Sequence, residues 1–331
     1  MGLRDRGPRR LRGRDLDVAL RMESAWGCSP WWDVGGQELH WADATVGAVH
    51  RYDPVGRADV VFARLRPPVP VVVPVAAPGV APAVAGSGSA GLHGWLVGQS
   101  NGVAVLDADG EIVQRTAVPG IGTTLRITSG TCDAAGRCWL TAVGVGADGR
   151  PEGEAGMASG RLFRIRPELD VARVDAGGVA PAGIGWSADG RTVFLADAGT
   201  SSVRVAPFDP STGTIGDERV LVDLSAGAPK GDADAVLVDL AVDIAGCVWV
   251  ALRGVGEVRR YSATGRLDTV VELPVTQPTA CAFGGLDNTT LFITTGWDGL
   301  DPVQRRKEPL AGALFAVQPG IAGVMPHTYR K

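Results

Sequence analysis

Lysine is nearly absent from this chain. Of its 32 basic residues only Lys230, Lys307 and Lys331 are lysine, and the formal net charge is −4. A chain with this charge has no electrostatic basis for binding nucleic acid. Histidine is also scarce, with 4 residues, and no Gly-x-Ser-x-Gly motif occurs, so a Ser–His nucleophile has little support. We expect neither a nucleic-acid partner nor a serine hydrolase.

Cysteine and uninterrupted apolar runs are rare as well. The 5 cysteines form an odd set without the spacing of a metal site: Cys28, Cys132, Cys138, Cys247 and Cys281. Cys132 and Cys138 flank a turn, so a bridge between them is one interpretation. Reduced thiols in a cytoplasmic protein are the interpretation that we favour. The apolar segment 69–86 contains Pro70, Pro74, Pro78 and Pro82. These prolines exclude a membrane helix and predict an irregular connection.

The first residues are strongly basic. Residues 4–14 contain 6 arginines, and the stretch that follows is not the apolar run that a twin-arginine signal needs. We therefore expect residues 1–16 to be a disordered basic tail and residues 17–331 to be a single domain.

The chain does contain a repeat. A strand, a small polar turn and a second strand recur at 39–54, 94–110, 138–168, 192–210, 248–265 and 291–320. Each copy has an aromatic residue in its first strand, and the set is Trp41, Trp95, Trp139, Phe194, Trp249 and Phe292. Their spacing suits one four-stranded propeller blade. A lone blade cannot bury both faces, so we predict an all-β fold, a six-bladed β-propeller of four-stranded antiparallel blades.

A second repeat precedes the first. Strands closed by tight turns occur at 29–37, 129–137, 182–191, 239–246 and 279–288, and a copy at 83–91 is degraded to small residues. Asn, Asp and Gly turns between apolar runs are typical of hairpins. These segments are therefore the expected inner strands of the blades.

Several segments together resemble a known family. WGCSPWWD, LRITSGTCDAAGR, GIGWSADG, PTACAFGG and TTGWDGLD occur in order, and the resemblance extends from about residue 18 to the C-terminus. The chain resembles the senescence-marker-protein/gluconolactonase family, also called regucalcin-like. The resemblance implies a six-bladed propeller that binds one divalent metal at the top of its channel and hydrolyses sugar lactones or related esters.

The positions that the resemblance would assign to the metal are altered. Cys28 replaces a Glu, Ala182 an Asn and Val238 an Asp. Aligning the inner strands with one another gives the same register, with Cys28, Thr128, Ala182, Val238 and Pro278 at equivalent places. A hard cation needs several oxygen ligands, which this set does not supply. We expect no metal and no other cofactor.

Side chains near the channel mouth are the candidate site. Arg126 survives from the family's R-F/L-N-D-G motif and suits a carboxylate or a developing oxyanion, although it could instead bridge two blades. Asp239 is the first choice for a general base, with Asp298 as a second acid. The predicted substrate-binding residues are Trp26, Cys28, Thr128, Ser129, Ala182, Val238, Arg253 and Trp297. Further polar residues on this face are Asp43, Asn101, Glu152, Glu154 and Asp197, and most loop aspartates of propellers form turns.

Three functions stay open at this point. The first is a metal-independent enzyme on a lactonase-like scaffold that acts on a small hydrophobic or aromatic metabolite, by lactone or ester opening, cyclisation or isomerisation. The second is a non-catalytic small-molecule-binding or scaffold propeller. The third is a metal-dependent lactonase with displaced ligands. The expected partner is a small-molecule metabolite, and we expect no association with a membrane. The sequence does not determine the oligomeric state.

Overall fold

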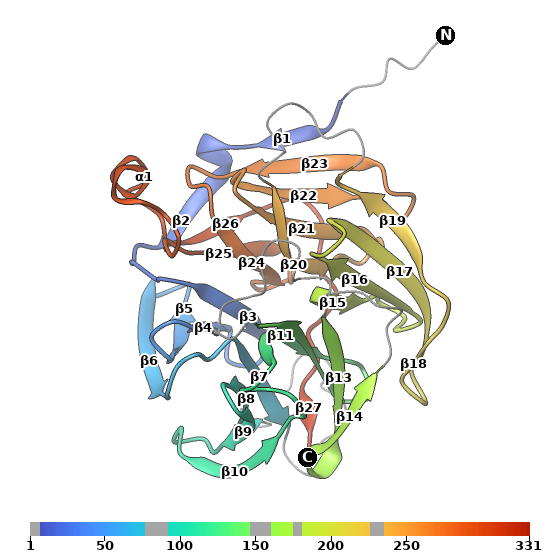
Figure 1. Cartoon of the computed structure of the whole chain (residues 1–331). Coiled ribbons are helices and arrows are strands. Elements are labelled where there is room, and N and C mark those ends of the chain that lie inside the picture. The colour runs from blue at the N-terminus through green and yellow to red at the C-terminus, as the bar shows by residue number, and fades with distance from the viewer. Residues whose placement is uncertain (1–6, 77–91, 146–159, 175–180, 226–234) are drawn as a thin grey trace.

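Six small sheets form a ring around a central channel in this computed structural model (Figure 1). The structure describes residues 7–76, 92–145, 160–174, 181–225 and 235–331. The inner strands meet in the middle of the ring, and the chain passes outward through each blade before it enters the next. The prediction of a six-bladed β-propeller is confirmed.

The first three blades read from the channel outward as follows. The first contains β3 (Gly27–Asp33), β4 (Glu38–Asp43), β5 (Ala48–Asp53) and β6 (Ala58–Arg64). The second contains β7 (Val71–Ala76), β8 (Leu92–Gln99), β9 (Gly102–Leu106) and β10 (Ile112–Ala117). The third contains β11 (Leu125–Cys132), β12 (Cys138–Gly144), β13 (Arg161–Arg166) and β14 (Asp170–Val174), with a 3-10 turn at Pro167–Leu169.

The other three blades follow the same plan. The fourth contains β15 (Pro181–Trp186), β16 (Thr192–Asp197) and β17 (Ser202–Asp209), and β17 pairs with both β18 (Thr214–Ile215) and β19 (Arg219–Asp223). The fifth contains β20 (Val236–Val242), β21 (Val248–Arg253), β22 (Glu257–Tyr261) and β23 (Leu267–Glu272). The sixth contains β24 (Pro278–Gly284), β25 (Thr290–Thr295) and β26 (Leu314–Val317), with helix α1 (Pro302–Lys307) between the last two.

The N-terminal segment closes the ring. Strand β2 (Leu16–Leu20) pairs with β26 and completes the sixth blade, so the start of the chain is joined to its last blade. Strand β1 (Arg9–Leu11) runs parallel to β23 on the outside of the fifth blade. A 3-10 turn at Gly13–Asp15 links β1 to β2. Leu11 is buried among apolar residues. Residues 9–16 are therefore ordered, contrary to the expected tail, because pairing and burial hold them; residues 1–6 lie outside the described part.

The second blade departs from the predicted register. Its inner strand β7 lies inside the proline-rich segment, where we expected an irregular connection, and the expected copy at 83–91 falls outside the described residues. Pro74 sits opposite Trp95 within this strand. Strand β7 pairs along its length with β8, and on its other side only Val75 and Ala76 pair with another described strand, so Pro74 lies next to an unpaired stretch of edge. An edge position tolerates a residue that lacks an N–H donor. Proline therefore does not exclude a strand here.

A buried aspartate fixes the hairpin of two blades. Asp133 Oδ2 accepts hydrogen bonds from Trp139 Nε1 at 2.8 Å and Arg137 Nε at 2.6 Å. Asp243 Oδ2 accepts from Trp249 Nε1 at 3.0 Å and from an arginine on β22. These carboxylates join the inner-strand turn to the aromatic strand. Each of these hydrogen bonds ties a turn of one sequence repeat to a strand of the other, so the two repeats form one structural unit. A buried carboxylate group needs such partners.

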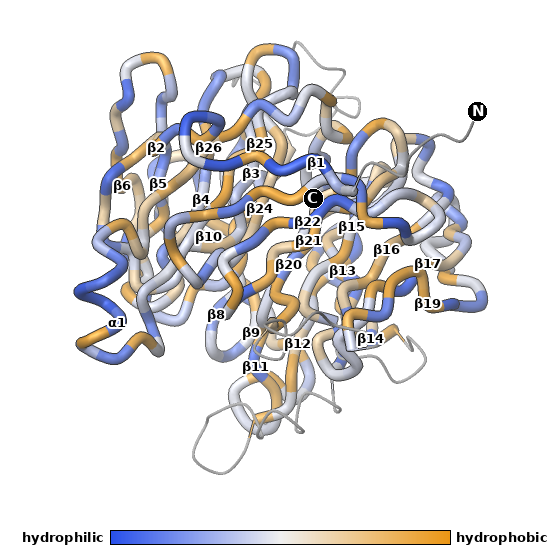
Figure 2. Tube along the Cα trace, turned by 90° about the horizontal axis from the view of Figure 1, so that it is seen from above, coloured by the Kyte–Doolittle hydropathy of each residue, from blue (hydrophilic) through white to orange (hydrophobic). Residues whose placement is uncertain are grey.

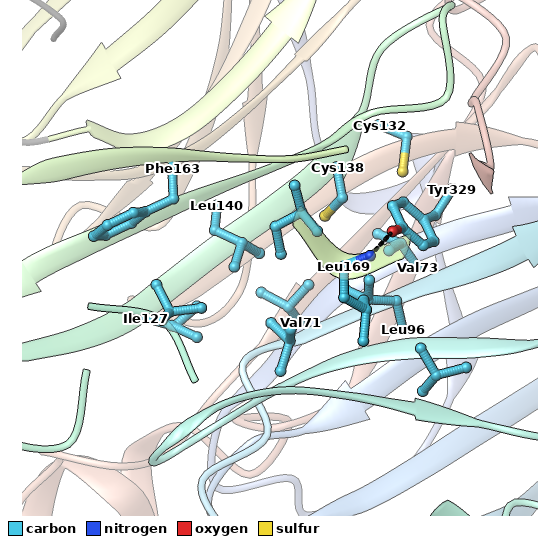
Figure 3. Packing of buried hydrophobic residues seen from close by; sticks show 14 of the residues in the cluster. Val71, Val73, Leu96, Ile127, Cys132, Cys138, Leu140, Phe163, Leu169 and Tyr329 are labelled. Atoms are coloured by element: carbon cyan, nitrogen blue, oxygen red, sulfur yellow. Dashed lines mark hydrogen bonds between the residues drawn. The ribbon is translucent and has the colours of Figure 1, made fainter. Parts of the chain in front are cut away.

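The C-terminal segment crosses the far end of the channel. Val324 N donates to Val242 O at 2.9 Å, Trp31 Nε1 donates to His327 O at 3.3 Å, and β27 (Tyr329–Arg330) pairs in parallel with β7. Tyr329 is 0% exposed and lies among apolar side chains of the second and third blades (Figure 3). The final residues of the chain therefore close one end of the propeller.

Apolar and hydrophilic segments separate along the blades. Figure 2 shows apolar stretches along the strands and hydrophilic ones at turns and along α1.

All five cysteines are free and buried, including Cys132 and Cys138, which lie opposite each other on paired strands. Among the described residues no helix has the length and apolar character needed to cross a membrane.

Candidate functional site

A cavity of about 410 Å³ lies where the inner strands begin, and we call it the mouth cavity. Ten of the eleven predicted site residues line it: Trp26, Cys28, Arg126, Thr128, Ser129, Ala182, Val238, Asp239, Arg253 and Asp298. Eight of them lie on strands of four of the six blades, and the other two, Trp26 and Asp298, lie in the loops before β3 and after β25. The inner-strand repeat had placed Cys28, Thr128, Ala182 and Val238 together, and the family resemblance and the loop positions had supplied the others.

A β-bulge shapes the start of four inner strands. The pairing with the second strand skips one residue at Thr128 in β11, Ala182 in β15, Val238 in β20 and Thr279 in β24. A bulge sets two residues of one strand against one of its partner and re-aims a side chain. This explains why both Val238 and Asp239 line the cavity although they are consecutive.

The predicted register needs correction in two blades. In the sixth blade the bulge falls on Thr279 rather than on Pro278. In the first blade it falls after Cys28, at Ser29 and Pro30, and Ser29 adopts a φ of 51°. The inner strands differ in bulge position, which a count of residues from the hairpin cannot reveal. Thr279 lines the cavity and was missed, although PTACAFGG placed it one residue away.

Asp239 is the central acidic group of the channel. It borders the mouth cavity and also a second cavity of about 130 Å³, the inner cavity, which the C-terminal residues Val324 to His327 close. Burial raises the pKa of Asp239 to about 7, and hydrogen bonds from the backbone amides of Leu240 and Cys281 partly oppose that shift. The surface that this half-buried side chain exposes faces the channel. A carboxyl group with such a pKa can take and return a proton near neutral pH.

The neighbouring blade is shaped to admit this carboxylate. A Cβ atom at Gly183 would lie 2.6 Å from Asp239 Oδ1 and 2.9 Å from Leu240 N. Any larger residue would displace the acid, so Gly183 is required by the close approach of β15 to β20. The glycine that follows the changed position Ala182 thus still serves the site.

Two arginines line the mouth cavity with no ion pair or hydrogen bond to the residues that the structure describes. Arg126 is exposed as a residue, yet partial burial of its guanidinium lowers the pKa of that group, against the effect of the Asp298 carboxylate. Arg253 lies at the end of β21, and its Cζ stands 5.8 Å from the centre of the Trp26 ring. Neither arginine bridges two blades through described carbonyls, so both are available to a ligand.

Cys28 is not a nucleophile in this setting. Its Sγ lies 3.6 Å from Ala42 O and 3.7 Å from Val69 O. Burial raises the pKa of the thiol strongly, and the negative charge of Asp43 adds to the shift. A thiol that stays protonated is a poor nucleophile and a poor metal ligand.

The hydroxyl groups at the bulges are held by partners. Thr128 Oγ1 lies 2.9 Å from Thr141 Oγ1, and Thr279 Oγ1 donates to Gly27 O at 2.5 Å. Ser29 Oγ donates to Val72 O at 3.1 Å and accepts from Val72 N at 2.9 Å, which joins the first two blades. These groups are fixed in position and form a polar rim around Asp239.

Trp297 does not reach the cavity, contrary to the prediction. Its Nε1 donates to Glu23 O at 3.0 Å, and Arg305 lies 4.0 Å from its ring centre. The indole therefore anchors α1 and the segment before β3. Asp298, the next residue, does line the cavity but is exposed.

Three other polar candidates, Asp43, Asn101 and Asp197, do not line the cavity. Asp43 accepts from Ser24 Oγ at 2.8 Å and Ala25 N at 3.0 Å, and Asp197 accepts from Gly199 N at 3.1 Å. Both are turn formers. Asn101 is exposed in the turn after β8, and Glu152 and Glu154 lie outside the described residues.

The described cavity lining does not fit a divalent metal. Its carboxylates are the half-buried Asp239 and the exposed Asp298, and the bulge positions beside Asp239 carry Ala182 and Val238. Across the described ranges no group of three or more His, Cys, Asp or Glu could hold an ion. A hard cation takes six or more oxygen ligands, with several carboxylates or carbonyls.

Metal titration tests this conclusion. We expect Ca²⁺, Mn²⁺ or Zn²⁺ titrated calorimetrically into desalted protein to give no saturable heat at micromolar concentration, and a chelator to leave the melting temperature unchanged. An ion that binds only the folded state would raise that temperature.

A double variant provides the control. Ala182→Asn and Val238→Asp add two oxygen side chains beside Asp239, so this protein should gain calcium binding in the millimolar range and lose stability without the ion. Uptake of about one ion per chain by the parent protein would contradict the conclusion.

Comparisons with known proteins agree with this architecture. Residues 26–296 match the SMP-30/Gluconolactonase/LRE-like region. A 6-deoxy-6-sulfogluconolactonase of Pseudomonas putida is 30% identical over 313 residues, which cover 93% of this chain and 96% of that protein. Regucalcin of Oryctolagus cuniculus is 29% identical over 206 residues, 62% of this chain and 66% of that protein.

Solved structures show the same fold. A calcium-binding regucalcin of Agrobacterium tumefaciens superposes with a TM-score of 0.79 at 19% identity, over 98% of this chain and 99% of the other. A luciferin-regenerating enzyme superposes with a TM-score of 0.78 at 21% identity, over 96% and 99%. With the match to residues 26–296, the chain belongs to the SMP-30/gluconolactonase/LRE-like family.

Proposed function

We propose that this protein is a metal-independent hydrolase that opens the lactone of a small hydrophobic or aromatic metabolite. The observation that carries the proposal is Asp239, a channel carboxyl group with a pKa of about 7 beside a cavity that two arginines also line. Such a pKa is matched to general acid–base work at neutral pH. The similarity to a lactonase of a sulfo-gluconolactone supports the reaction class.

Asp239 acts as the base in this scheme. Its carboxylate takes a proton from a water molecule as the water oxygen attacks the lactone carbonyl carbon. The carbonyl oxygen becomes an oxyanion, and the ring C–O bond then breaks. The protonated Asp239 returns its proton to the leaving ring oxygen, so one lactone and one water give one hydroxy acid.

Arg126 stabilises the oxyanion. Its guanidinium has no ion pair within the described structure, and partial burial lowers its pKa, so a developing negative charge in the cavity strengthens its interactions. Preformed donors aimed at such a charge are usually a large part of catalysis.

The apolar part of the mouth cavity accommodates the substrate ring. Ile127, Val143, Ala182, Leu237 and Val238 line it, together with the Trp26 indole. The alkyl side chains of Ala182 and Val238, which stand at two bulges where the family resemblance implies polar residues, make this wall suited to an apolar ring rather than to a polyhydroxylated one. The inner cavity on the other side of Asp239 is large enough for water, with polar borders at Ser29 and Ser129.

Arg126→Met tests the assignment. We expect kcat for lactone opening to fall roughly a hundredfold, as for loss of one oxyanion donor, while KM changes little. The measurement is steady-state hydrolysis of a panel of γ- and δ-lactones with aromatic, alkyl and sugar rings, in the presence of a chelator.

Two results would contradict the proposal. One is hydrolysis that requires added metal. The other is the absence of hydrolysis from the whole panel together with tight binding of its members, which would indicate a binding protein. Arg115→Met, a change on the outer strand β10 away from the cavity lining, is the matched control.

A further inference from the structure

The mouth cavity contains more positive charge than the proposed hydrolysis uses. Its charged lining residues within the described chain are Arg126, Arg253, Asp239 and Asp298. Asp298 is exposed, and Asp239 is only partly ionised at neutral pH because burial raises its pKa to about 7. At neutral pH two positive guanidinium groups therefore face the exposed Asp298 carboxylate and the partly protonated Asp239 carboxyl group. Arg126 is assigned to the oxyanion, and Arg253 is left without a role.

Arg253 is held in place but is not satisfied. Its Nε is buried and has no hydrogen-bond partner among the described residues. Its Cζ stands 5.8 Å from the centre of the Trp26 ring, within reach of a cation–π interaction. The terminal N–H groups of the same guanidinium are not among the buried atoms and have no hydrogen bond or ion pair within the described residues, so they are the donors that a ligand in the cavity can reach.

The chemistry of a guanidinium defines that ligand. Its N–H groups form a planar fork that matches a carboxylate, sulfonate or phosphate with two parallel hydrogen bonds. A neutral hydroxyl or ester oxygen would meet only one of these donors. The Trp26 indole beside the guanidinium offers an apolar surface to the same ligand.

We propose that Arg253, positioned by Trp26, binds a permanent anionic substituent of the substrate, separate from the ester bond that is opened. This inference rests on the proposed function in one respect, namely that the ligand bound by Arg253 is the substrate of the hydrolase. The substrate class is then an apolar or aromatic lactone that carries a carboxylate, sulfonate or phosphate group. Arg126 and Arg253 have different tasks, because one meets charge that develops during the reaction and the other meets charge already present.

A binding experiment tests the anion site without any reaction. Benzoate and benzenesulfonate are compared with benzamide, a neutral molecule of nearly the same shape, by calorimetric titration into the full chain. We expect the anions to bind at least about tenfold more tightly than benzamide, as for a charge-assisted pair. Arg253→Met should abolish this preference and Arg253→Lys should keep part of it.

A kinetic experiment separates the two arginines. A lactone with a carboxylate substituent is compared with its methyl ester. Arg253→Met should raise KM for the charged lactone roughly ten- to a hundredfold more than it raises KM for the neutral lactone, and the change in KM should exceed any change in kcat. Arg126→Met should lower kcat for both lactones. The melting temperature of ligand-free Arg253→Met should equal that of the parent, and Arg253→Gln replaces it if that variant does not fold.

The outcomes distinguish this inference from the proposed function. If benzamide binds as tightly as benzoate, or if the preference for anions survives Arg253→Met, the anion site is wrong even when lactones are hydrolysed. If the anion preference depends on Arg253 but neither lactone is hydrolysed, the proposed hydrolase is wrong and the anion site stands.

Discussion

Asp239→Asn should lower kcat/KM for lactone opening by roughly 10²- to 10⁴-fold, the usual contribution of a positioned general base. An amide of the same shape cannot accept the proton of the attacking water. The protein should remain folded, because Asn can still accept a hydrogen bond from the Leu240 or Cys281 amide that now contacts Asp239. The measurement is steady-state hydrolysis at pH 8, where the parent carboxylate is ionised.

The pH dependence gives the same residue a signature. The pKa of Asp239 is raised to about 7, so the base is protonated below that pH and ionised above it. We expect kcat/KM of the parent to rise with pH up to about 7 and to level off above it. The residual activity of Asp239→Asn should lack this transition. A parent profile that is flat between pH 5.5 and 8.5 would argue against Asp239 as the base.

Stability should change in the opposite direction from activity. The ordinary pKa of an aspartate carboxyl group is 3.8 and that of Asp239 in the folded chain is about 7, so between these values the unfolded chain has released a proton that the folded chain keeps. The free energy of unfolding therefore falls as pH rises from about 4 to about 7 and stays low above that. Asp239→Asn removes this penalty and should be more stable than the parent by roughly 1–3 kcal/mol at pH 8, a range reduced from the full shift because the side chain faces the cavities.

A matched acid-to-amide change is the control for both effects. Asp109 is exposed in the turn between β9 and β10 and does not line either cavity. Asp109→Asn should leave kcat/KM, its pH profile and the unfolding midpoint within error. If Asp239→Asn behaves like Asp109→Asn, the assignment of the base is wrong.

Tyr329→Ala should destabilise the protein by about 3–5 kcal/mol, as for other large aromatic side chains removed from a core. Tyr329 is 0% exposed, its hydroxyl donates to Arg166 O at 2.6 Å, and Leu169 N donates to that hydroxyl at 3.2 Å. The ring packs in the cluster that joins the second and third blades (Figure 3). Chemical denaturation monitored by tryptophan fluorescence measures the loss.

Two smaller changes separate the contributions of the ring and of the hydroxyl group to the loss of stability in Tyr329→Ala. Tyr329→Phe keeps the ring but leaves the Arg166 carbonyl and the Leu169 amide without this partner, so the expected loss is about 1–2 kcal/mol. Deleting Lys331, which is exposed, should change stability by less than about 0.5 kcal/mol. Equal stability of Tyr329→Ala and the parent would mean that the C-terminal segment does not hold the channel closed.

The blade architecture and most of the mouth cavity could be predicted because both repeat along the chain. Each aromatic strand and its hairpin lie within a single blade, so the pairing of Trp139 with the Asp133 turn is a local matter. Symmetry then brings equivalent positions to the same end of the channel, which is why Thr128, Ala182 and Val238 meet in one cavity. A repeated local pattern carries its own spatial arrangement.

The features that the sequence repeats did not predict depend on contacts between segments that lie far apart along the chain. Trp297 is turned away from the cavity by Glu23 and Arg305. Strand β7 tolerates Pro74 because, within the described chain, only Val75 and Ala76 pair on its second side, and Arg9–Leu11 are ordered by β23. No local pattern predicts such contacts.

The chain by itself determined the number of blades and the end of the channel at which Thr128, Ala182 and Val238 meet, because both follow from the spacing of the repeats, and the family resemblance added the altered metal positions. Only the tertiary structure decided the charge state of Asp239, the unpaired donor of Arg253 and the closure of the channel by Val324 to Tyr329. The pKa of an acid and the cost of an unpaired donor depend on what surrounds them once water is removed, and the surroundings here come from several blades and the C-terminus at once.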